Sequence, residues 1–288
     1  MFKNLNAGAV GIHGLDLAQT IELAQKIGFG GIDFSIQEAA QLADAHGVEY
    51  VRKLFDEAGV KPGQWGLPVA WNKDEAEWKE GLAALPRLAA LGLALGCTRT
   101  ATWCLSGSNE RPFEENWQWH IGRFRPIAEI LAAHGCVLGI EFLGPQTIRD
   151  RFEHEFVYTL GGMMALAREI GGNVGLLLDA WHLFTSGDGL DVLDEIAARD
   201  VVTVHVNDAP EGLTLESYVD SDRRLPMETG VIDLPGLINK LAAMGYDGPV
   251  TPEPFSKRIN ELAAQDAMAA GELIADYMAR LWKAAGLE

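Results

Sequence analysis

Short apolar runs alternate with longer helical segments along the whole chain of 288 residues. Polar or glycine-containing residues separate each run from the helical segment that follows, and the unit occurs eight times. Strands that alternate with helices indicate parallel pairing through right-handed crossovers. The predicted strands are 9–12, 31–35, 61–66, 97–103, 136–142, 174–179, 201–207 and 248–254.

The helical segments between these strands complete the unit. A glycine follows the end of several of them, as at Gly28, Gly59 and Gly135, and can supply a left-handed cap that turns the chain back. Eight units predict one (β/α)8 TIM barrel domain over residues 1–288, rather than an open doubly wound sheet. No glycine-rich phosphate fingerprint follows the first predicted strand. The predicted helices are 16–27, 36–58, 74–95, 113–133, 157–170, 189–198, 233–244 and 260–285.

The composition narrows the classes of partner and compartment. A formal net charge of -18 argues against nucleic acid or an anionic membrane, because both require neutralising lysine and arginine. Cys97, Cys104 and Cys136 form no CxxC motif and are interpreted as reduced thiols of a cytosolic protein. We find neither a secretory signal nor an apolar window of membrane-spanning length, so a soluble cytoplasmic protein is expected.

Four side chains of types that can bind metals stand at the ends of the last four predicted strands: Glu141, Asp179, His205 and Glu253. The C-terminal ends of barrel strands converge on one pocket. Three carboxylates crowded there repel one another unless a cation neutralises them, and an imidazole fits the same shell. The sequence therefore predicts one divalent metal ion, with Mn²⁺, Mg²⁺ or Co²⁺ favoured and Zn²⁺ as a further candidate.

Two residues near this set have two interpretations each. His182 follows Asp179 in a D-x-x-H arrangement, so it either reaches a substrate oxygen or serves as an additional metal ligand. Asp208 lies just past the seventh strand, where it either orients His205 or caps the following turn.

Arg223 and Arg224 are adjacent cations in an acidic protein. Each can bind a hydroxyl, enolate or carboxylate of a substrate, or form an ion pair with Asp220 or Asp222. They lie in the segment 207–231, which, like 143–155, is long for a loop between strand and helix. Both segments are expected either to shape the substrate pocket or to decorate the surface.

Aromatic residues near other strand ends can form an apolar wall for a sugar ring. Trp103 is the preferred candidate, and His13 after the first predicted strand is a further candidate for the pocket. Each tryptophan can equally be core packing, so only one or two are expected to face a ligand. The others considered are Trp65, Trp71 and Trp181.

Together these residues resemble the xylose isomerase-like barrel superfamily, and in particular its sugar phosphate isomerase/epimerase group. The resemblance implies a divalent metal held by Glu141, Asp179, His205 and Glu253. In ketose epimerases of the group, the two glutamates also exchange substrate protons from opposite faces, through an enediolate. The segments that carry it are Gly139-Ile140-Glu141, Leu178-Asp179-Ala180-Trp181-His182, Val204-His205-Val206-Asn207-Asp208, Gly230-Val231-Ile232-Asp233 and Val250-Thr251-Pro252-Glu253-Pro254.

The chain also departs from parts of that superfamily. Thr147 stands where ketose 3-epimerases carry a further glutamate. The endonuclease IV branch has additional histidines where strands three and four here end in Trp65 and Trp103, and Asp-Arg-His where this chain has Asp222-Arg223-Arg224. Together with the net charge, these differences argue against DNA repair.

The resulting prediction is a metal-dependent isomerase or epimerase of a keto-sugar or related polyhydroxy carbonyl compound. Its catalytic residues are expected to be Glu141 and Glu253, and an unphosphorylated substrate is favoured because no lysine and arginine cluster lies at strand ends. The alternatives are a lyase, either inosose dehydratase-like or C-glycoside-cleaving, and a non-catalytic sugar- or metal-binding subunit. The resemblance also implies a homo-oligomer.

Overall fold

Eight parallel strands close into a barrel in the computed structural model, which describes residues 1–287. Around the barrel the order is β1, β2, β3, β4, β6, β8, β9, β10, and β10 pairs again with β1. This arrangement confirms the predicted TIM barrel. The strands are β1 Phe2–Leu5, β2 Gly31–Phe34, β3 Lys61–Gly66, β4 Arg99–Cys104, β6 Val137–Phe142, β8 Val174–Asp179, β9 Val201–Val206 and β10 Pro249–Pro252.

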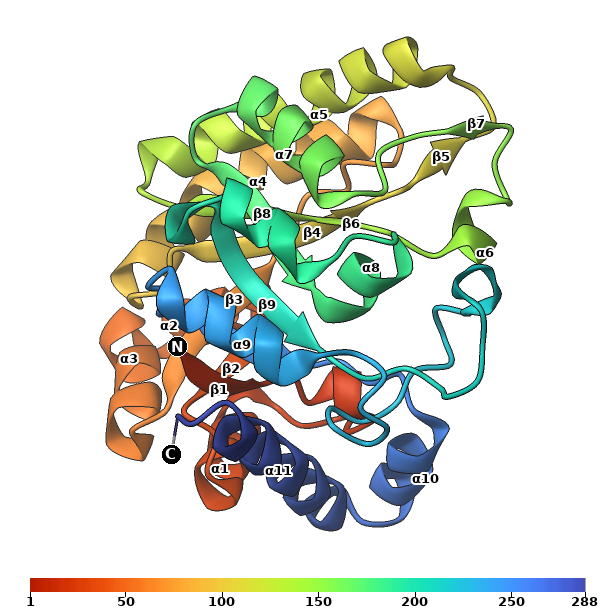
Figure 1. Ribbon diagram of the computed structural model, residues 1–288. Helices are drawn as coiled ribbons and strands as arrows, with labels where there is room; N and C mark the ends of the chain where they lie inside the picture. The colour runs from red at the N-terminus through yellow and green to blue at the C-terminus, as the bar shows by residue number, and fades with distance from the viewer. Residues whose placement is uncertain (288) are drawn as a thin grey trace.

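Helices surround the barrel, and the first and last of them, α1 and α11, pack together next to the chain termini (Figure 1). Several begin where the sequence offers a capping side chain; Asp16, for example, accepts the backbone N–H of Gln19. The helices are α1 Leu17–Ile27, α2 Ile36–His46, α3 Val48–Ala58, α4 Glu75–Ala94, α5 Phe113–Ala133, α6 Gln146–Arg149, α7 Leu160–Ile170, α8 Ala180–Thr185, α9 Leu234–Ala243, α10 Lys257–Gln265 and α11 Ala267–Ala284. Within residues 1–287, none of them has the length and hydrophobicity needed to cross a membrane.

The first predicted strand was placed wrongly. The chain enters the barrel earlier, through Phe2–Leu5, and residues 9–12 contain a 3-10 turn, Gly8–Val10, that ends at Gly11 with φ 77°. Val10 and Ile12 are buried, so the apolar run is real, but it packs in the core without pairing. A short apolar run does not by itself distinguish a strand from a buried turn.

Three predicted helices also differ. The segment 36–58 forms two helices, α2 and α3, because Gly47 adopts φ 89° between them. Segment 260–285 is divided at Asp266, whose side chain caps the start of α11. Segment 189–198 forms 3-10 turns rather than an α-helix.

A polar network fills the barrel interior between the first three strands. The Asp33 carboxylate accepts N–H groups from the side chains of Asn4, Asn6 and Gln64, the last at 2.9 Å. Asn4 also donates to the Thr251 hydroxyl at 2.9 Å. The network therefore joins β1, β2, β3 and β10 with a carboxylate whose hydrogen-bond donors are all neutral amides.

The longer loops gather at the C-terminal ends of the strands, on the right of Figure 1. They include α6, α8 and the segment 207–231. A two-stranded antiparallel sheet, β5 Gly107–Ser108 with β7 His154–Glu155, joins the loops after β4 and β6. The barrel thus presents a built-up rim over one face, where barrel enzymes place their active sites.

Candidate metal centre and its pocket

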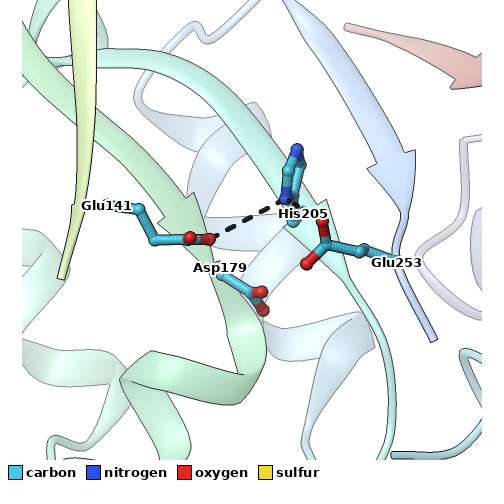
Figure 2. A group of neighbouring side chains, drawn as sticks. All are labelled: Glu141, Asp179, His205 and Glu253. Atoms are coloured by element: carbon cyan, nitrogen blue, oxygen red, sulfur yellow. Dashed lines mark ion pairs between the residues drawn. The ribbon is translucent and has the colours of Figure 1, made fainter. Parts of the chain in front are cut away.

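Glu141, Asp179, His205 and Glu253 point toward one another at the ends of β6, β8, β9 and β10 (Figure 2). One potential ligand atom from each lies within 4.8 Å of all the others. His205 Nδ1 is 3.5 Å from Glu253 Oε1 and 3.8 Å from Glu141 Oε1. The barrel register produces this meeting, because Asp179 pairs directly with His205 across β8 and β9.

Local backbone interactions fix two of the four residues. The Asp179 carboxylate accepts the Trp181 N–H at 2.7 Å, at the start of α8, and the Asn207 side-chain amide at 2.9 Å. Glu253 lies between Pro252 and Pro254, and its own N–H donates to Val206 at 3.0 Å. Pro254 restricts the residue before it, Glu253, to extended conformations, and the ring of Pro252 fixes its own φ angle. The two prolines therefore limit how the backbone around Glu253 can move.

Arg223 enters the centre from the loop 207–231 with only 1% of its surface exposed. Its Nη1 lies 2.7 Å from Asp179 Oδ2 and 3.1 Å from Glu253 Oε2, and its Nη2 lies 2.7 Å from Asp220. The pairing with Asp220 is one of the two roles predicted from the sequence. Contact with two of the candidate ligands was not predicted.

Arg224 and His13 lie away from the cluster. The Arg224 guanidinium pairs with Asp222 at 2.6 Å, while its backbone N–H and C=O bond to Asp208. His13 is exposed and does not line the pocket described below. The structure therefore brings only the first of the two adjacent arginines to the candidate ligands.

The four groups strongly perturb each other's proton affinity. Burial, together with Glu253 and Asp179, raises the pKa of Glu141 well above its usual value. Burial lowers the pKa of His205, but the neighbouring carboxylates outweigh it and raise the value to about 10. Burial raises the pKa of Glu253, yet His205 and Arg223 reverse this and hold it below the ordinary value. The cluster therefore concentrates negative charge that His205 and Arg223 only partly balance.

The donor set fits a divalent cation. Glu141 Oε1 and His205 Nε2 are buried without a hydrogen-bond partner, and His205 Nδ1 has only ion-pair approaches, the nearer to Glu253 at 3.5 Å. Buried polar atoms normally have a hydrogen-bond partner. These atoms have none in the protein, so they favour a bound ion that would supply one. Three carboxylates and one imidazole match the preference of hard or borderline divalent metals.

A cavity of about 440 Å³ opens above this cluster, within the size range of small-molecule sites. Trp103, which is 39% exposed, lies at its wall, whereas Trp65 and Trp181 are fully buried in the core. The remaining lining residues are Leu105, Glu141, Leu143, Ile148, Arg151, His182, Val219, Asp220, Ser221, Arg223, Glu253 and Phe255.

His182 lines this cavity as a neutral side chain. Burial is the main reason that its pKa falls to about 3. The Gly144 N–H donates to its Nδ1 at 3.2 Å, and its Nε2 lies 3.3 Å from Arg223 Nη2, which can only donate. His182 therefore packs against Arg223, near Asp220, in the lining of the cavity.

Asp208 closes the loop 207–231 and does not contact His205. Its carboxylate accepts the backbone N–H groups of Ala209, Thr229, Gly230 and Ile232, at 2.6 to 3.0 Å. Of the two interpretations left open by the sequence, the cap is the one observed. We call Asp208 and these four N–H groups the Asp208 clamp.

Arg151 and Phe255 are two of the pocket residues that were not identified from the sequence. Arg151 follows α6, and Phe255 has an unusual φ of 37° directly after Pro254. Arg151 lies in the long segment 143–155, so that insertion was a usable signal. No sequence pattern pointed to Phe255, whose ring packs on the Arg223 guanidinium at 4.5 Å.

Residues 21–274 match the xylose isomerase-like TIM barrel family, and the chain belongs to this family. It is 23% identical over 257 residues to an inosose isomerase of Halalkalibacterium halodurans, covering 88% of each chain. It is 24% identical over 248 residues to an L-ribulose 3-epimerase of Mesorhizobium japonicum, covering 85% of this chain and 77% of the relative.

Two solved structures share the whole barrel. A xylose isomerase domain protein from Alicyclobacillus acidocaldarius superposes with a TM-score of 0.86 at 25% identity, over 99% of both chains. The IolI protein, solved with a zinc atom, superposes with a TM-score of 0.75 at 20% identity, over 97% of this chain and 99% of the other. The second likeness concerns the fold alone.

Proposed function

We propose that this protein is a divalent-metal-dependent isomerase or epimerase of a keto-sugar or related polyhydroxy carbonyl compound. One observation carries the proposal: Glu141 and Glu253 approach the same point from opposite sides, and both line the pocket (Figure 2). The relatives support the substrate class, since one is an inosose isomerase and another an L-ribulose 3-epimerase.

In this proposal Glu141, Asp179, His205 and Glu253 hold the cation. A divalent metal at this point supplies a Lewis acid that polarises a substrate carbonyl. The oxygen-rich donor set favours Mn²⁺, Mg²⁺ or Co²⁺. The zinc atom of the IolI structure supports Zn²⁺ as a further candidate.

The two glutamates perform the proton transfers. Glu253, whose pKa is held low, removes a proton from the carbon next to the carbonyl and leaves an enediolate. Glu141, whose pKa is raised, returns a proton from the other side. Return to the same carbon inverts it, while return to the neighbouring carbon, together with transfer of the hydroxyl proton to the former carbonyl oxygen, moves the carbonyl. Arg223 donates hydrogen bonds to substrate oxygens, and His182 lines the pocket beside it.

A lyase is the second candidate, and Thr147 is the observation that favours it. This residue stands where ketose 3-epimerases carry a further glutamate, and its hydroxyl donates to the Tyr218 carbonyl at 2.8 Å. It does not line the pocket. Mass analysis of products separates the two reactions, because an isomerase conserves substrate mass whereas a dehydratase or a glycoside-cleaving enzyme does not.

The metal content of purified protein tests the proposal most directly. Mass spectrometry of wild type, prepared without metal-affinity resins and supplied with Mn²⁺, is expected to find about one divalent ion per chain, and Asp179→Asn should lose it. Glu228→Gln is the matched control, because it alters a carboxylate of the loop 207–231 that pairs with Arg258 outside the cluster. A wild type that binds no divalent metal would contradict the proposal, as would the absence of turnover on a panel of ketoses and inososes.

A further inference from the structure

A second cavity of about 300 Å³ adjoins the pocket of the candidate metal centre. Leu105 lines both cavities. Trp71, in the lining of the second cavity, packs edge-on against Trp103 of the first, with ring centroids 5.3 Å apart. A ligand held at the metal centre therefore has this second space directly beside it.

Two buried polar side chains in the second cavity have unused hydrogen-bonding atoms. Asn116 and His120 lie one turn apart on α5, each 2% exposed, and Asn116 Nδ2 and His120 Nε2 have no partner. His120 Nδ1 lies 2.8 Å from the Asn116 carbonyl oxygen, which can only accept, so Nδ1 carries the proton. Burial lowers the His120 pKa to about 4, so the ring is neutral and Nε2 is an acceptor.

This pair matches the chemistry of an alcohol. A hydroxyl group donates one hydrogen bond and accepts others, so it can donate to His120 Nε2 and accept from Asn116 Nδ2. A carboxylate has no proton to give to His120 at neutral pH, and a phosphate monoester has lost most of its own. The two unused atoms thus favour a neutral hydroxyl over an anion.

The charge of the cavity leads to the same preference. Its arginine, Arg111, stacks on Trp119 with the guanidinium carbon 4.4 Å from the ring centroid. It also pairs with Glu110 at 3.0 Å, so its charge is already balanced. Asn72 and Asn109 add neutral amides to the lining. Neutral polar groups together with the indole rings of Trp71 and Trp119 suit an uncharged polyhydroxy ring.

We propose that this second cavity binds a further sugar unit linked to the keto-sugar, so that the substrate is a keto-disaccharide or a glycoside of that size. The inference rests on the proposed function and narrows its substrate class. The keto unit occupies the cavity at the metal centre, and the linkage passes Leu105 and the Trp71–Trp103 pair. Asn116 and His120 hold a hydroxyl of the outer unit.

Calorimetric titration of the Mn²⁺-supplemented protein tests the inference with defined sugars. The probes are D-fructose and three disaccharides that end in a fructose unit: turanose, maltulose and isomaltulose. At least one disaccharide is expected to bind about 10-fold more tightly than D-fructose, as two additional buried hydrogen bonds and ring contact would produce.

Variants link that difference to the cavity. Asn116→Leu keeps the side-chain size and removes the amide, and Arg111→Met removes the guanidinium from a partly exposed position. Each is expected to reduce the affinity ratio of disaccharide to D-fructose to about one or two. Arg52→Met, on the exposed side of α3, is the matched control and should keep the wild-type ratio. Circular dichroism of each variant verifies the fold.

Equal affinity for D-fructose and all three disaccharides in wild type would overturn the inference and leave the proposed function standing. A preference that survives in both cavity variants would overturn it as well. If the protein binds no ketose of either size and turns over none, the proposed function fails and the inference fails with it.

Discussion

Two groups of buried carboxylates, at the ends of neighbouring strands, have opposite surroundings. In the Asp208 clamp the carboxylate is fully buried, and four backbone N–H groups surround it. In the candidate metal centre, Glu141 is also buried, but its Oε1 has no hydrogen-bond donor and its neighbours include the carboxylates of Glu253 and Asp179. The two carboxylates are buried to a similar extent, but they differ in the groups that balance their charge.

This difference separates a structural role from a chemical one. A buried charge is tolerated when hydrogen-bond donors satisfy it, and it destabilises the fold when they do not. The clamp uses its carboxylate to hold the loop 207–231, and nothing more is required of it. The centre leaves part of its charge unbalanced, which disfavours the metal-free fold and favours a cation.

Replacing Glu253 by glutamine should reduce turnover more than any other change. If turnover did not fall, the centre would no longer differ from the clamp in having a chemical role. The amide cannot remove a proton, so turnover is expected to fall about 1,000-fold or more, within the range for losing a general base. The kcat for the best ketose or inosose substrate measures this. Glu228→Gln, in the loop 207–231 but paired with Arg258, should keep wild-type turnover. Full activity in Glu253→Gln would remove the proton-transfer role.

Asp208→Asn should destabilise the protein, because it weakens the Asp208 clamp. One carboxylate oxygen becomes an NH2 group that faces backbone donors, so the free energy of unfolding is expected to fall by about 3 kcal/mol. Urea unfolding followed by circular dichroism gives the value. An unchanged midpoint would mean that the clamp does not hold the loop.

Asp33 provides an intermediate case, a carboxylate held by amides alone. Burial raises its pKa to about 6, although His205, Gln64 and Asn4 each lower it. A folded pKa above the unfolded one of 3.8 means that the native state binds the proton more tightly, so stability falls as pH rises from about 4 to 6. After allowance for its partial exposure, the loss is about 2 kcal/mol. Unfolding of wild type and Asp33→Asn across this pH range measures it, and parallel curves for the two would contradict the assignment.

Glu141→Gln should give the smallest change, with the opposite sign to the clamp variant. Because the charged form of Glu141 is disfavoured in the fold, a neutral amide is expected to stabilise the metal-free protein by about 1 kcal/mol at neutral pH. Thermal unfolding with a chelator present detects this as a higher Tm. A lower Tm would contradict this prediction, because it would mean that the folded protein stabilises the charged Glu141 carboxylate.

The strand–helix spacing predicted both the barrel and the meeting of four distant residues, because strand ends in a parallel barrel converge whatever the loops do. It could not predict that residues 9–12 lie outside the sheet, since the pairing of Phe2–Leu5 with β2 and β10 is a long-range property. The position of Arg223 depends on how the loop 207–231 folds back. Asp208 is similar: its partners lie up to 24 residues further along, beyond any local pattern.

The prolines on either side of Glu253 act even when the protein is denatured. Ring closure fixes the φ angles of Pro252 and Pro254, and Pro254 disfavours the helical region for Glu253, whatever the rest of the chain does. These three residues therefore have fewer conformers in the denatured ensemble, which reduces the number that folding must discard there. At this candidate ligand, covalent structure limits the local backbone geometry before any tertiary contact forms.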